Sequence, residues 1–329
     1  MKVFVAGATG AVGKRLVPLL VAQGYDVVAM TRSAEKVDSL RAIGAEPVIA
    51  DGLDRAAVIK ALMYSEPEVV IHEMTGLAGV TSIRHFDKEF AVTNRLRSEG
   101  TDHLIEGARA AGARRLIAQS FGNWYSDRTG PGAKTEEDPL DPDPPAAQRR
   151  SFAAVRHLER AVLGTDGIEG LALRYGNFYG PGTALAADGE IAALVRRRRF
   201  PIVGVGAGVS SFIHVDDAAA ATAAAIERGA PGLYNIADDE PAPVADWLPE
   251  LARTLGAKPP RRVPVWLARL AVGEVGVSMM TRTAGASNAK AKRELGWRPR
   301  YPSYREGFQS GFGDLPIPTP EALGNQRRA

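Results

Sequence analysis

Short apolar runs alternate with amphipathic stretches as far as about residue 236. The apolar runs have the length of buried strands, and the stretches between them repeat apolar residues every three to four positions, as amphipathic helices do. The predicted strands are 2–6, 26–31, 46–50, 68–74, 114–120, 170–175 and 232–236. The predicted helices are 14–21, 35–43, 56–63, 84–111, 151–163 and 216–227. This alternation with short connections predicts an α/β fold, a doubly wound parallel sheet with right-handed crossovers.

The alternating pattern loosens in three places. Residues 127–148 are rich in Gly, Pro and Asp, which predicts a surface loop that could act as a lid. Beyond residue 176 the elements become smaller, but we expect the Ala-rich helix and the late strand within 216–236 to return to the sheet. The Pro-rich stretch after Phe312 can form neither a helix nor a central strand, so 313–329 is predicted to be an extended tail.

Three glycines spaced three apart, Gly7, Gly10 and Gly13, lie between the first predicted strand and the first helix. Gly7 would permit a tight turn, Gly10 would let the backbone approach a phosphate, and Gly13 would let the helix pack on the strand. The backbone N–H groups and the positive helix end then lie where a pyrophosphate could bind. Ligands of such sheets bind beyond the carboxyl ends of the strands. The further candidate positions are therefore Arg32, Asp51, the segment 72–75 and Ser120.

Composition narrows the class of protein. The chain has 329 residues, 45% of them hydrophobic and 24% charged, which is ordinary for a globular protein with a sizeable core. Cys is absent, which excludes disulfides, thiolate metal sites and a Cys nucleophile. The net charge of +3 comes from scattered cations and the run 196–199, which no aromatic residues interleave, so we expect no nucleic-acid partner. With no leader and no long apolar segment, we expect a cytoplasmic protein without membrane association.

Four separated motifs together resemble the extended short-chain dehydrogenase/reductase superfamily, in its NAD-dependent epimerase/dehydratase group. They are Gly7-Ala-Thr-Gly-Ala-Val-Gly13, Leu173-Arg-Tyr-Gly-Asn-Phe-Tyr-Gly-Pro-Gly182, Phe212-Ile-His-Val-Asp-Asp-Ala218 and Lys292-Arg-Glu-Leu-Gly-Trp297. The resemblance covers about residues 1–310 and implies a Rossmann-type core that binds NAD(H) or NADP(H), at 1–175. It also implies a smaller substrate-binding part at 176–312, a small-molecule substrate such as a nucleotide sugar, another carbonyl compound or an alcohol, and commonly a homodimer.

The end of the second predicted strand bears on the choice of cofactor. NAD-preferring sites carry Asp or Glu there, which binds the ribose hydroxyls. This chain has Thr31-Arg32-Ser33, with Lys36 one turn on, and a guanidinium can bind a 2′-phosphate. We therefore predict NADP(H), with NAD(H) still open. In the alternative interpretation, Arg32 is a surface cation beside Glu35.

The resemblance also implies roles for residues at later strand ends. Asp51 and Leu53 match the family's adenine position, the segment 74–76 matches the chain beneath the pyrophosphate and ribose, and 177–178 matches the segment near the nicotinamide. His72 is interpreted as a structural histidine. The complete predicted cofactor set is Gly7, Thr9, Gly10, Ala11, Val12, Gly13, Arg32, Asp51, Gly52, Leu53, Met74, Thr75, Gly76, Ser120, Arg156, Tyr175, Asn177 and Phe178.

The family's catalytic pair is missing. Members of the family normally carry Tyr-x-x-x-Lys on the helix after the fifth strand, where the Lys charge lets the Tyr hydroxyl exchange a proton during hydride transfer. In this chain Phe152 and Arg156 take those places, or Ser151 and Val155 if Glu159 sets the register. Phe cannot donate a proton, and Arg stays charged, so neither register supplies the proton relay.

Substitute proton donors can be named from the sequence. Tyr125 on the loop after the fifth strand is the best placed, followed by Ser120, and then by His157 on the helix. In the alternative interpretation Tyr125 anchors its loop beside Trp124, and His157 lies on an exposed helix face. The segment 214–217 is interpreted as a strand-to-helix junction capped by Asp216 or Asp217, and no metal site is predicted.

Two hypotheses follow from these residues. The first is an NADP(H)-dependent reductase, dehydrogenase or epimerase-like enzyme that acts on a small carbonyl, imine or sugar-type substrate with a non-standard proton donor. An already activated substrate, such as an iminium, could accept a hydride without the Tyr. The second is a catalytically silent NADP(H)-binding sensor similar to the NmrA-like regulators, which share the fold and lack the Tyr.

Overall fold

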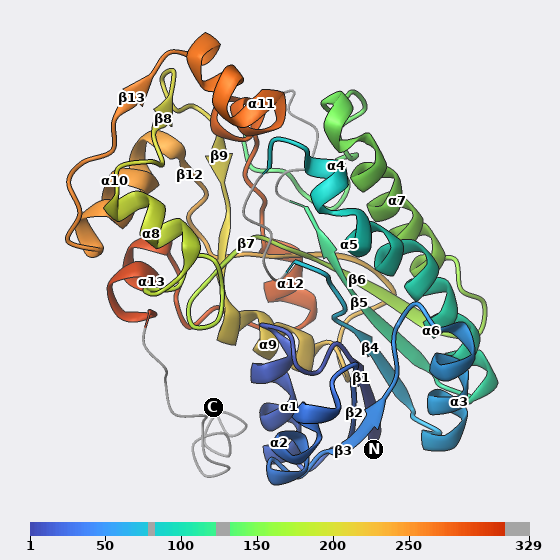
Figure 1. Cartoon of the computed structure of the whole chain (residues 1–329). Coiled ribbons are helices and arrows are strands. Elements are labelled where there is room, and N and C mark those ends of the chain that lie inside the picture. The colour runs from blue at the N-terminus through green and yellow to red at the C-terminus, as the bar shows by residue number, and fades with distance from the viewer. Residues whose placement is uncertain (78–82, 123–131, 313–329) are drawn as a thin grey trace.

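The computed structural model describes residues 1–77, 83–122 and 132–312, and its core is one seven-stranded sheet (Figure 1). All strand pairs in this sheet are parallel, and the strand order is β11-β6-β5-β4-β1-β2-β3. The strands are β1 Lys2–Ala6, β2 Asp26–Thr31, β3 Glu46–Ile49, β4 Val69–His72, β5 Arg115–Phe121, β6 Glu169–Tyr175 and β11 Gly232–Ile236. The predicted doubly wound Rossmann-type sheet is confirmed. The strand order reverses between β1 and β4, where such sheets bind their ligands.

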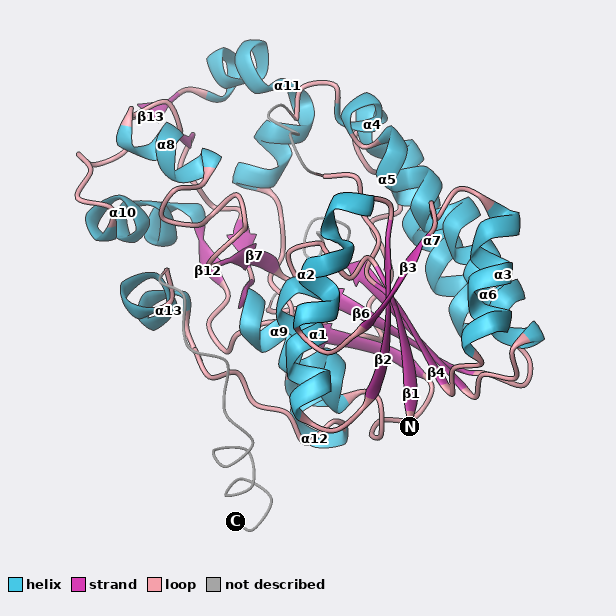
Figure 2. Ribbon diagram, turned by 60° about the horizontal axis from the view of Figure 1, so that its bottom comes forward, coloured by secondary structure: helices cyan, strands magenta, loops and turns pink. Residues whose placement is uncertain are grey.

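Helices cover both faces of the sheet (Figure 2). One face packs against α1 Gly13–Ala22, α9 Val215–Ala224 and α12 Ala289–Glu294, and the other against α3 Arg55–Ser65, α6 Thr101–Ala110 and α7 Arg149–Leu163. Because both faces are covered, the central strands are apolar throughout, and Val3, Phe4 and Val5 of β1 are fully buried. The shorter helices of this part of the chain are η1 Ala34–Lys36, α2 Val37–Ala42, α4 Phe86–Glu89, α5 Ala91–Arg95, η2 Leu96–Gly100 and η3 Ala146–Gln148.

Smaller elements form a second lobe beside the sheet, coloured yellow to red in Figure 1. Its strands pair two by two as β7 with β10, β8 with β13, and β9 with β12. An aromatic cluster that includes Phe212, Trp247 and Phe308 forms its core. Its strands are β7 Asn177–Tyr179, β8 Ile202–Val203, β9 Val209–Ser210, β10 Phe212–His214, β12 Ala242–Pro243 and β13 Arg262–Val263. Its helices are α8 Glu190–Arg196, α10 Val244–Thr254, α11 Val265–Thr281 and α13 Tyr304–Ser310.

The predicted helix at 84–111 is divided in the structure. It consists of α4, α5, a π-helical turn η2 and α6, in that order. The carboxylate of Asp87 in α4 caps a different helix, because it accepts hydrogen bonds from Arg150 N and Ser151 N at the start of α7. The apolar period alone could not show this, since a π turn changes the spacing by one residue without changing the composition.

Three further findings bear on the expectations. The described part of the loop 127–148 begins at residue 132 and contains η3, while the predicted tail 313–329 lies outside the described residues. Within the described residues, no helix is long and apolar enough to cross a membrane. The same residues contain no cluster of His, Asp or Glu side chains that could hold a metal ion.

Candidate active site

The glycine turn after β1 packs directly on the end of β4. Gly7 has a φ of +93°, and a Cβ there would lie 2.6 Å from the carbonyl of Glu73. Gly13 is equally restricted, because its Cβ would overlap the backbone of Gly7 and Ala8. Gly10, by contrast, is exposed. The first turn of α1 has no acidic residue and no side-chain cap, although Lys14 N and Arg15 N donate to the carbonyls of Gly10 and Val12. Without a carboxylate of its own in this turn, the positive end of the helix suits an anion.

A cavity of about 350 Å³ lies beside this turn, at the end of β2. Its lining residues are Thr9, Thr31, Arg32, Ser33, Lys36 and Asp51. The hydroxyl of Thr31 accepts a hydrogen bond from Ser33 N at 3.2 Å, which fixes the backbone that carries Arg32. Asp51 Oδ1 accepts one from Leu53 N at 2.9 Å, which orients the carboxylate on the opposite side.

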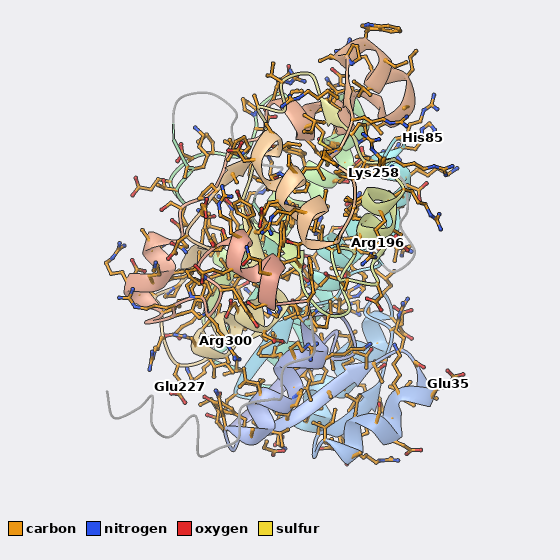
Figure 3. The ribbon with its side chains drawn as sticks, turned by 90° about the vertical axis from the view of Figure 1, so that its left-hand side faces the viewer. Glu35, His85, Arg196, Glu227, Lys258 and Arg300 are labelled. Atoms are coloured by element: carbon orange, nitrogen blue, oxygen red, sulfur yellow. The ribbon has the colours of Figure 1, made fainter. Side chains whose placement is uncertain are left out.

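The two cations of this cavity are uncommitted in the described structure. No ion pair or hydrogen bond joins Arg32 or Lys36 to a carboxylate among the described residues, and Arg32 is exposed. Glu35, the partner considered for Arg32, extends from the ribbon into solvent (Figure 3). The cavity thus combines two free cations with one carboxylate, a set suited to a phosphorylated ribose beside a base that donates hydrogen bonds.

At the end of β4, both ring nitrogens of His72 contact backbone groups. His72 Nε2 lies 3.3 Å from Leu96 O, and His72 Nδ1 accepts from Met74 N at 3.2 Å. Burial lowers the pKa of His72 to about 4, so the ring is neutral and donates through Nε2. This agrees with a structural histidine. Beyond it, Met74 packs on Gly52, and Gly76 N donates to Thr93 Oγ1 at 3.0 Å.

A buried carboxyl group that the sequence did not single out lies beneath the glycine turn. Tyr175 Oη is 3.0 Å from Glu73 Oε1 and 2.5 Å from Thr222 Oγ1, and Thr222 donates to Ala218 O at 2.8 Å. The Tyr175 hydroxyl donates to Glu73 Oε1. Burial raises the pKa of Glu73 to about 8, which agrees with a protonated carboxyl group. Tyr175, predicted to line the cofactor site, is fully buried, and its hydroxyl is hydrogen-bonded to Glu73 and Thr222.

Helix α7 carries both pairs of residues that could take the family's catalytic positions. Ser151 and Val155 are both buried, and in the other pair Phe152 is buried while Arg156 is exposed. Neither pair contains a Tyr or a Lys. Arg156 donates from Nη2 to Asp141 O at 2.9 Å, which fastens the preceding loop to the helix.

The hydroxyl of Ser151 lies in a closed set of hydrogen bonds. It donates to Asp87 Oδ1 at 2.7 Å and accepts from Asn94 Nδ2 at 2.9 Å. Asp87 and Asn94 come from α4 and α5, and neither was identified from the sequence. An acidic residue early in the predicted helix 84–111 is the only signal that could have suggested the contact.

Ser120, a predicted catalytic and cofactor residue, is similarly committed. Its hydroxyl donates to Glu159 Oε1 at 2.8 Å, and the same carboxylate forms a buried bidentate pair with Arg174 at 2.7 Å on both nitrogens. The one proton of Ser120 is thus held by a carboxylate rather than turned toward an open site. This arrangement ties the ends of β5 and β6 to α7.

The remaining candidates lie at the edges of the site. Tyr125 lies outside the described residues. His157 Nε2 lies 2.7 Å from Asp102 Oδ1 on the partly exposed face of α7. Asn177 and Phe178 are half-buried on β7, with the Phe178 ring 5.2 Å from that of Tyr175.

The junction at 214–217 has the structural role expected for it, although the capping residue differs. The imidazole of His214 caps α9 by accepting from Asp216 N at 3.1 Å. Asp217 accepts from Arg300 N and Tyr301 N, which ties the C-terminal part to the helix.

Taken together, the described side chains can bind a dinucleotide but offer little to move a proton. Cations lie at the end of β2, and the positive end of α1 follows the glycine turn, where phosphates would bind. Next to them, the hydroxyls of Ser120 and Ser151 are bonded to carboxylates, and neither pair of positions on α7 holds a Tyr or a Lys.

Comparison with known proteins gives matches of three kinds. Residues 3–237 match the model of the NAD dependent epimerase/dehydratase family. A Streptomyces protein named 3-diazoavenalumate denitrifying reductase is 47% identical over 310 residues, covering 94% of this chain and 99% of the relative. The UDP-glucose 4-epimerase of Thermus thermophilus, in complex with NAD, has a TM-score of 0.72 at 23% identity, over 95% of this chain and 98% of that one. Human epimerase family protein SDR39U1 with NADPH has a TM-score of 0.75 at 18% identity, over 96% and 100%.

Proposed function

Because the chain belongs to the NAD-dependent epimerase/dehydratase family, we propose that it is an NADPH-dependent reductase that replaces the diazo group of an aromatic acid with hydrogen. Family membership makes it a nicotinamide-dependent enzyme of the reductase and epimerase kind. The narrower choice is supported by the 47% identity to a diazo-compound reductase and by the lack of the family's proton relay.

The missing relay is the observation that carries the proposal. Reduction of a carbonyl group consumes a hydride and a proton, and the Tyr of the family would supply the proton. In this chain neither Ser151 and Val155 nor Phe152 and Arg156 supplies a Tyr and a Lys, and the hydroxyl of Ser120 donates to Glu159. A substrate whose reduction takes up no proton would make that relay unnecessary.

An aryl diazonium ion is such a substrate. Bound NADPH would supply a hydride. The diazonium compound gains that hydrogen with its two electrons as a new C–H bond, the C–N bond breaks, and N2 leaves. The positive charge of the diazonium ion is cancelled by the hydride, so the sum of the reaction consumes no proton. The protein then has to bind, orient and exclude water rather than exchange protons.

The choice of NADPH over NADH rests on the cavity at the end of β2. Arg32 and Lys36 would hold the 2′-phosphate, and Asp51 would accept from the adenine amine on the opposite wall. The glycine turn and the positive N-terminal end of α1 would hold the pyrophosphate. The rest of the predicted cofactor set remains a prediction.

The test is turnover of a diazonium acid. Purified protein is incubated with NADPH and 4-carboxybenzenediazonium, NADPH oxidation is followed by absorbance, and 15N-labelled N2 is measured in the gas phase. We expect one N2 and one benzoate per NADPH consumed, well above the rate without protein. Tight NADPH binding without N2 release would contradict the proposal and favour the sensor hypothesis.

A further inference from the structure

Arg97 is a buried arginine without a partner among the described residues. It lies in the π-helical turn η2 and is 3% exposed. Its Nε and Nη1 atoms are buried and donate no hydrogen bond to any described residue, and no ion pair joins the guanidinium to a carboxylate among those residues. A buried charge without a counter-ion is strongly unfavourable, so buried charges in proteins are normally paired.

The position of Arg97 directs its side chain toward the candidate active site. Side chains of a helix lean toward its N-terminus, so Arg97 leans over the turn that holds Thr93 and Asn94. Thr93 contacts Gly76 at the end of β4, and Asn94 contacts Ser151 at the start of α7. The guanidinium is also close enough to His72 to help lower the pKa of that ring. It therefore lies among the ends of β4, α5 and α7.

Two carboxylates of α4 and α7, Asp87 and Glu159, already have partners within the chain. Asp87 accepts hydrogen bonds from Arg150 N, Ser151 N and Ser151 Oγ. Glu159 gives both of its oxygens to Arg174 and accepts from Ser120 as well. Among the described residues, the charge of Arg97 therefore has no counter-ion, and an anion from outside the chain could pair with it.

Other buried side chains on α4 and η3, which pack on the same helix α7 as the η2 turn, would suit an aromatic ligand. The rings of Phe86 and Phe90 stack at 3.9 Å and form an apolar cluster with Val275. Gln148 belongs to η3, which packs on α4, and it is 1% exposed with both side-chain amide atoms unpartnered among the described residues. An apolar wall, a free amide and a free guanidinium are the groups that an aromatic carboxylate needs.

We propose that Arg97 binds the carboxylate of the substrate, in a bidentate pair, and so orients the aromatic ring in the reductase site. This rests on the proposed function for the identity of the ring's reacting group, but the carboxylate pair itself does not depend on diazo chemistry. A planar guanidinium matches a carboxylate through two parallel hydrogen bonds, which fixes direction as well as position.

The experiment compares ligand binding and stability in Arg97 variants of the full chain. The probes are 4-hydroxybenzoate and its neutral analogue 4-hydroxybenzamide, with NADPH binding measured separately. We expect the carboxylate to bind the wild type at least tenfold more tightly than the amide, and Arg97→Met to abolish this difference. Without ligand, Arg97→Met should unfold at the same or a higher temperature than the wild type, since it removes an unpaired buried charge.

Two controls separate the alternatives. Arg95→Met removes an exposed cation of the neighbouring helix α5 that pairs with Glu99, and it should leave both probes unaffected. Arg97→Lys keeps the positive charge but cannot form two parallel hydrogen bonds, so it should retain only part of the preference for the carboxylate. The proposal is overturned if 4-hydroxybenzoate does not bind the wild type, if Arg97→Met weakens NADPH instead of the carboxylate, or if the variant lowers the unfolding temperature and leaves binding unchanged. If the wild type binds 4-hydroxybenzoate as expected but releases no N2 from the diazonium acid, the result contradicts the proposed function and not the role of Arg97.

Discussion

At the end of β2, the chain has Arg32 where NAD-preferring sites of this fold have a carboxylate. This position was readable from the sequence because it follows a strand and needs no knowledge of the tertiary structure. The structure adds the cavity, the uncommitted state of Lys36 and the orientation of Asp51. Those could not be predicted, since they depend on how the ends of β1, β2 and β3 meet.

Reversing the charge at Arg32 tests the cofactor assignment. Arg32→Asp should weaken NADPH binding roughly 10- to 100-fold, because a charge-assisted hydrogen bond contributes about 1.5–3 kcal/mol, and should weaken NADH binding far less. Fluorescence titration of both cofactors measures this. Arg41→Asp changes an exposed cation of α2 and should alter neither affinity. Equal loss for NADPH and NADH in Arg32→Asp would rule out a 2′-phosphate contact.

Glu73 predicts a pH dependence of stability. Its pKa is raised by burial from the usual value near 4.5 to about 8, so its stabilising protonated form is complete below about pH 4.5 and is lost as the pH rises through about 8. Between these values, unfolding releases the proton, and the free energy of unfolding should fall by on the order of 1.4 kcal/mol per pH unit from this group. Glu73→Gln is neutral at every pH.

Urea titrations from pH 5 to pH 8.5 measure this dependence. Glu73→Gln should flatten the slope and be more stable than the wild type at pH 8, with little difference at pH 5. Glu68→Gln changes an exposed carboxylate just before β4 and serves as the control. Parallel slopes for the wild type and Glu73→Gln would mean that Glu73 is ionised in the folded protein.

The residues at the family's catalytic positions predict a negative result. Phe152→Tyr combined with Arg156→Lys restores the letters of the motif, but Arg156 lies on the exposed face of α7 and bonds to Asp141 O. We expect this double variant to fold and still not reduce an aldehyde, measured as NADPH oxidation. A gain of aldehyde reduction with a rate that titrates near neutral pH would show that Phe152 and Arg156 face the substrate.

At the scale of elements, the strands of the sheet and helix α7 were predicted to within a few residues, because buried parallel strands and amphipathic helices have distinct apolar periods. The π turn at Leu96–Gly100 and the division of 84–111 were not predicted. A single residue of altered spacing has almost no effect on the apolar pattern, although it turns Arg97 inward.

The contact between α4 and α7 can be tested as a helix cap, because Asp87 of α4 caps the start of α7. Asp87 serves two backbone N–H groups at the start of α7, so Asp87→Ala should cost about 1–2 kcal/mol of stability, as the loss of a helix N-cap does. Amide hydrogen exchange should accelerate at Arg150 and Ser151 while the strands stay protected. Asp38→Ala, at an exposed site paired with Arg41, provides the comparison. Unchanged exchange at both amides would show that α7 does not need this cap.

At the scale of the whole molecule, the doubly wound sheet brings together the ends of β1, β2, β4, β5 and β6, where the candidate groups lie. The fold was predictable from alternation and the glycine turn, and the family comparison confirms it. The reaction was not, because the sequence shows that the Tyr and Lys are absent but cannot show that the hydroxyls of Ser120 and Ser151 are held by Glu159 and Asp87. We therefore propose that the site binds a dinucleotide and transfers a hydride without a proton relay.

The most direct measurement of that claim is a matched pair of substrates, 4-carboxybenzenediazonium and 4-carboxybenzaldehyde, which share the ring and the carboxylate. Single-turnover NADPH oxidation is followed by stopped flow for both at saturating cofactor, from pH 6 to pH 8. We expect the diazonium ion to be reduced at least 100-fold faster than the aldehyde, at a rate independent of pH over this range. Aldehyde reduction at a similar or higher rate would contradict it, since it would require a proton donor.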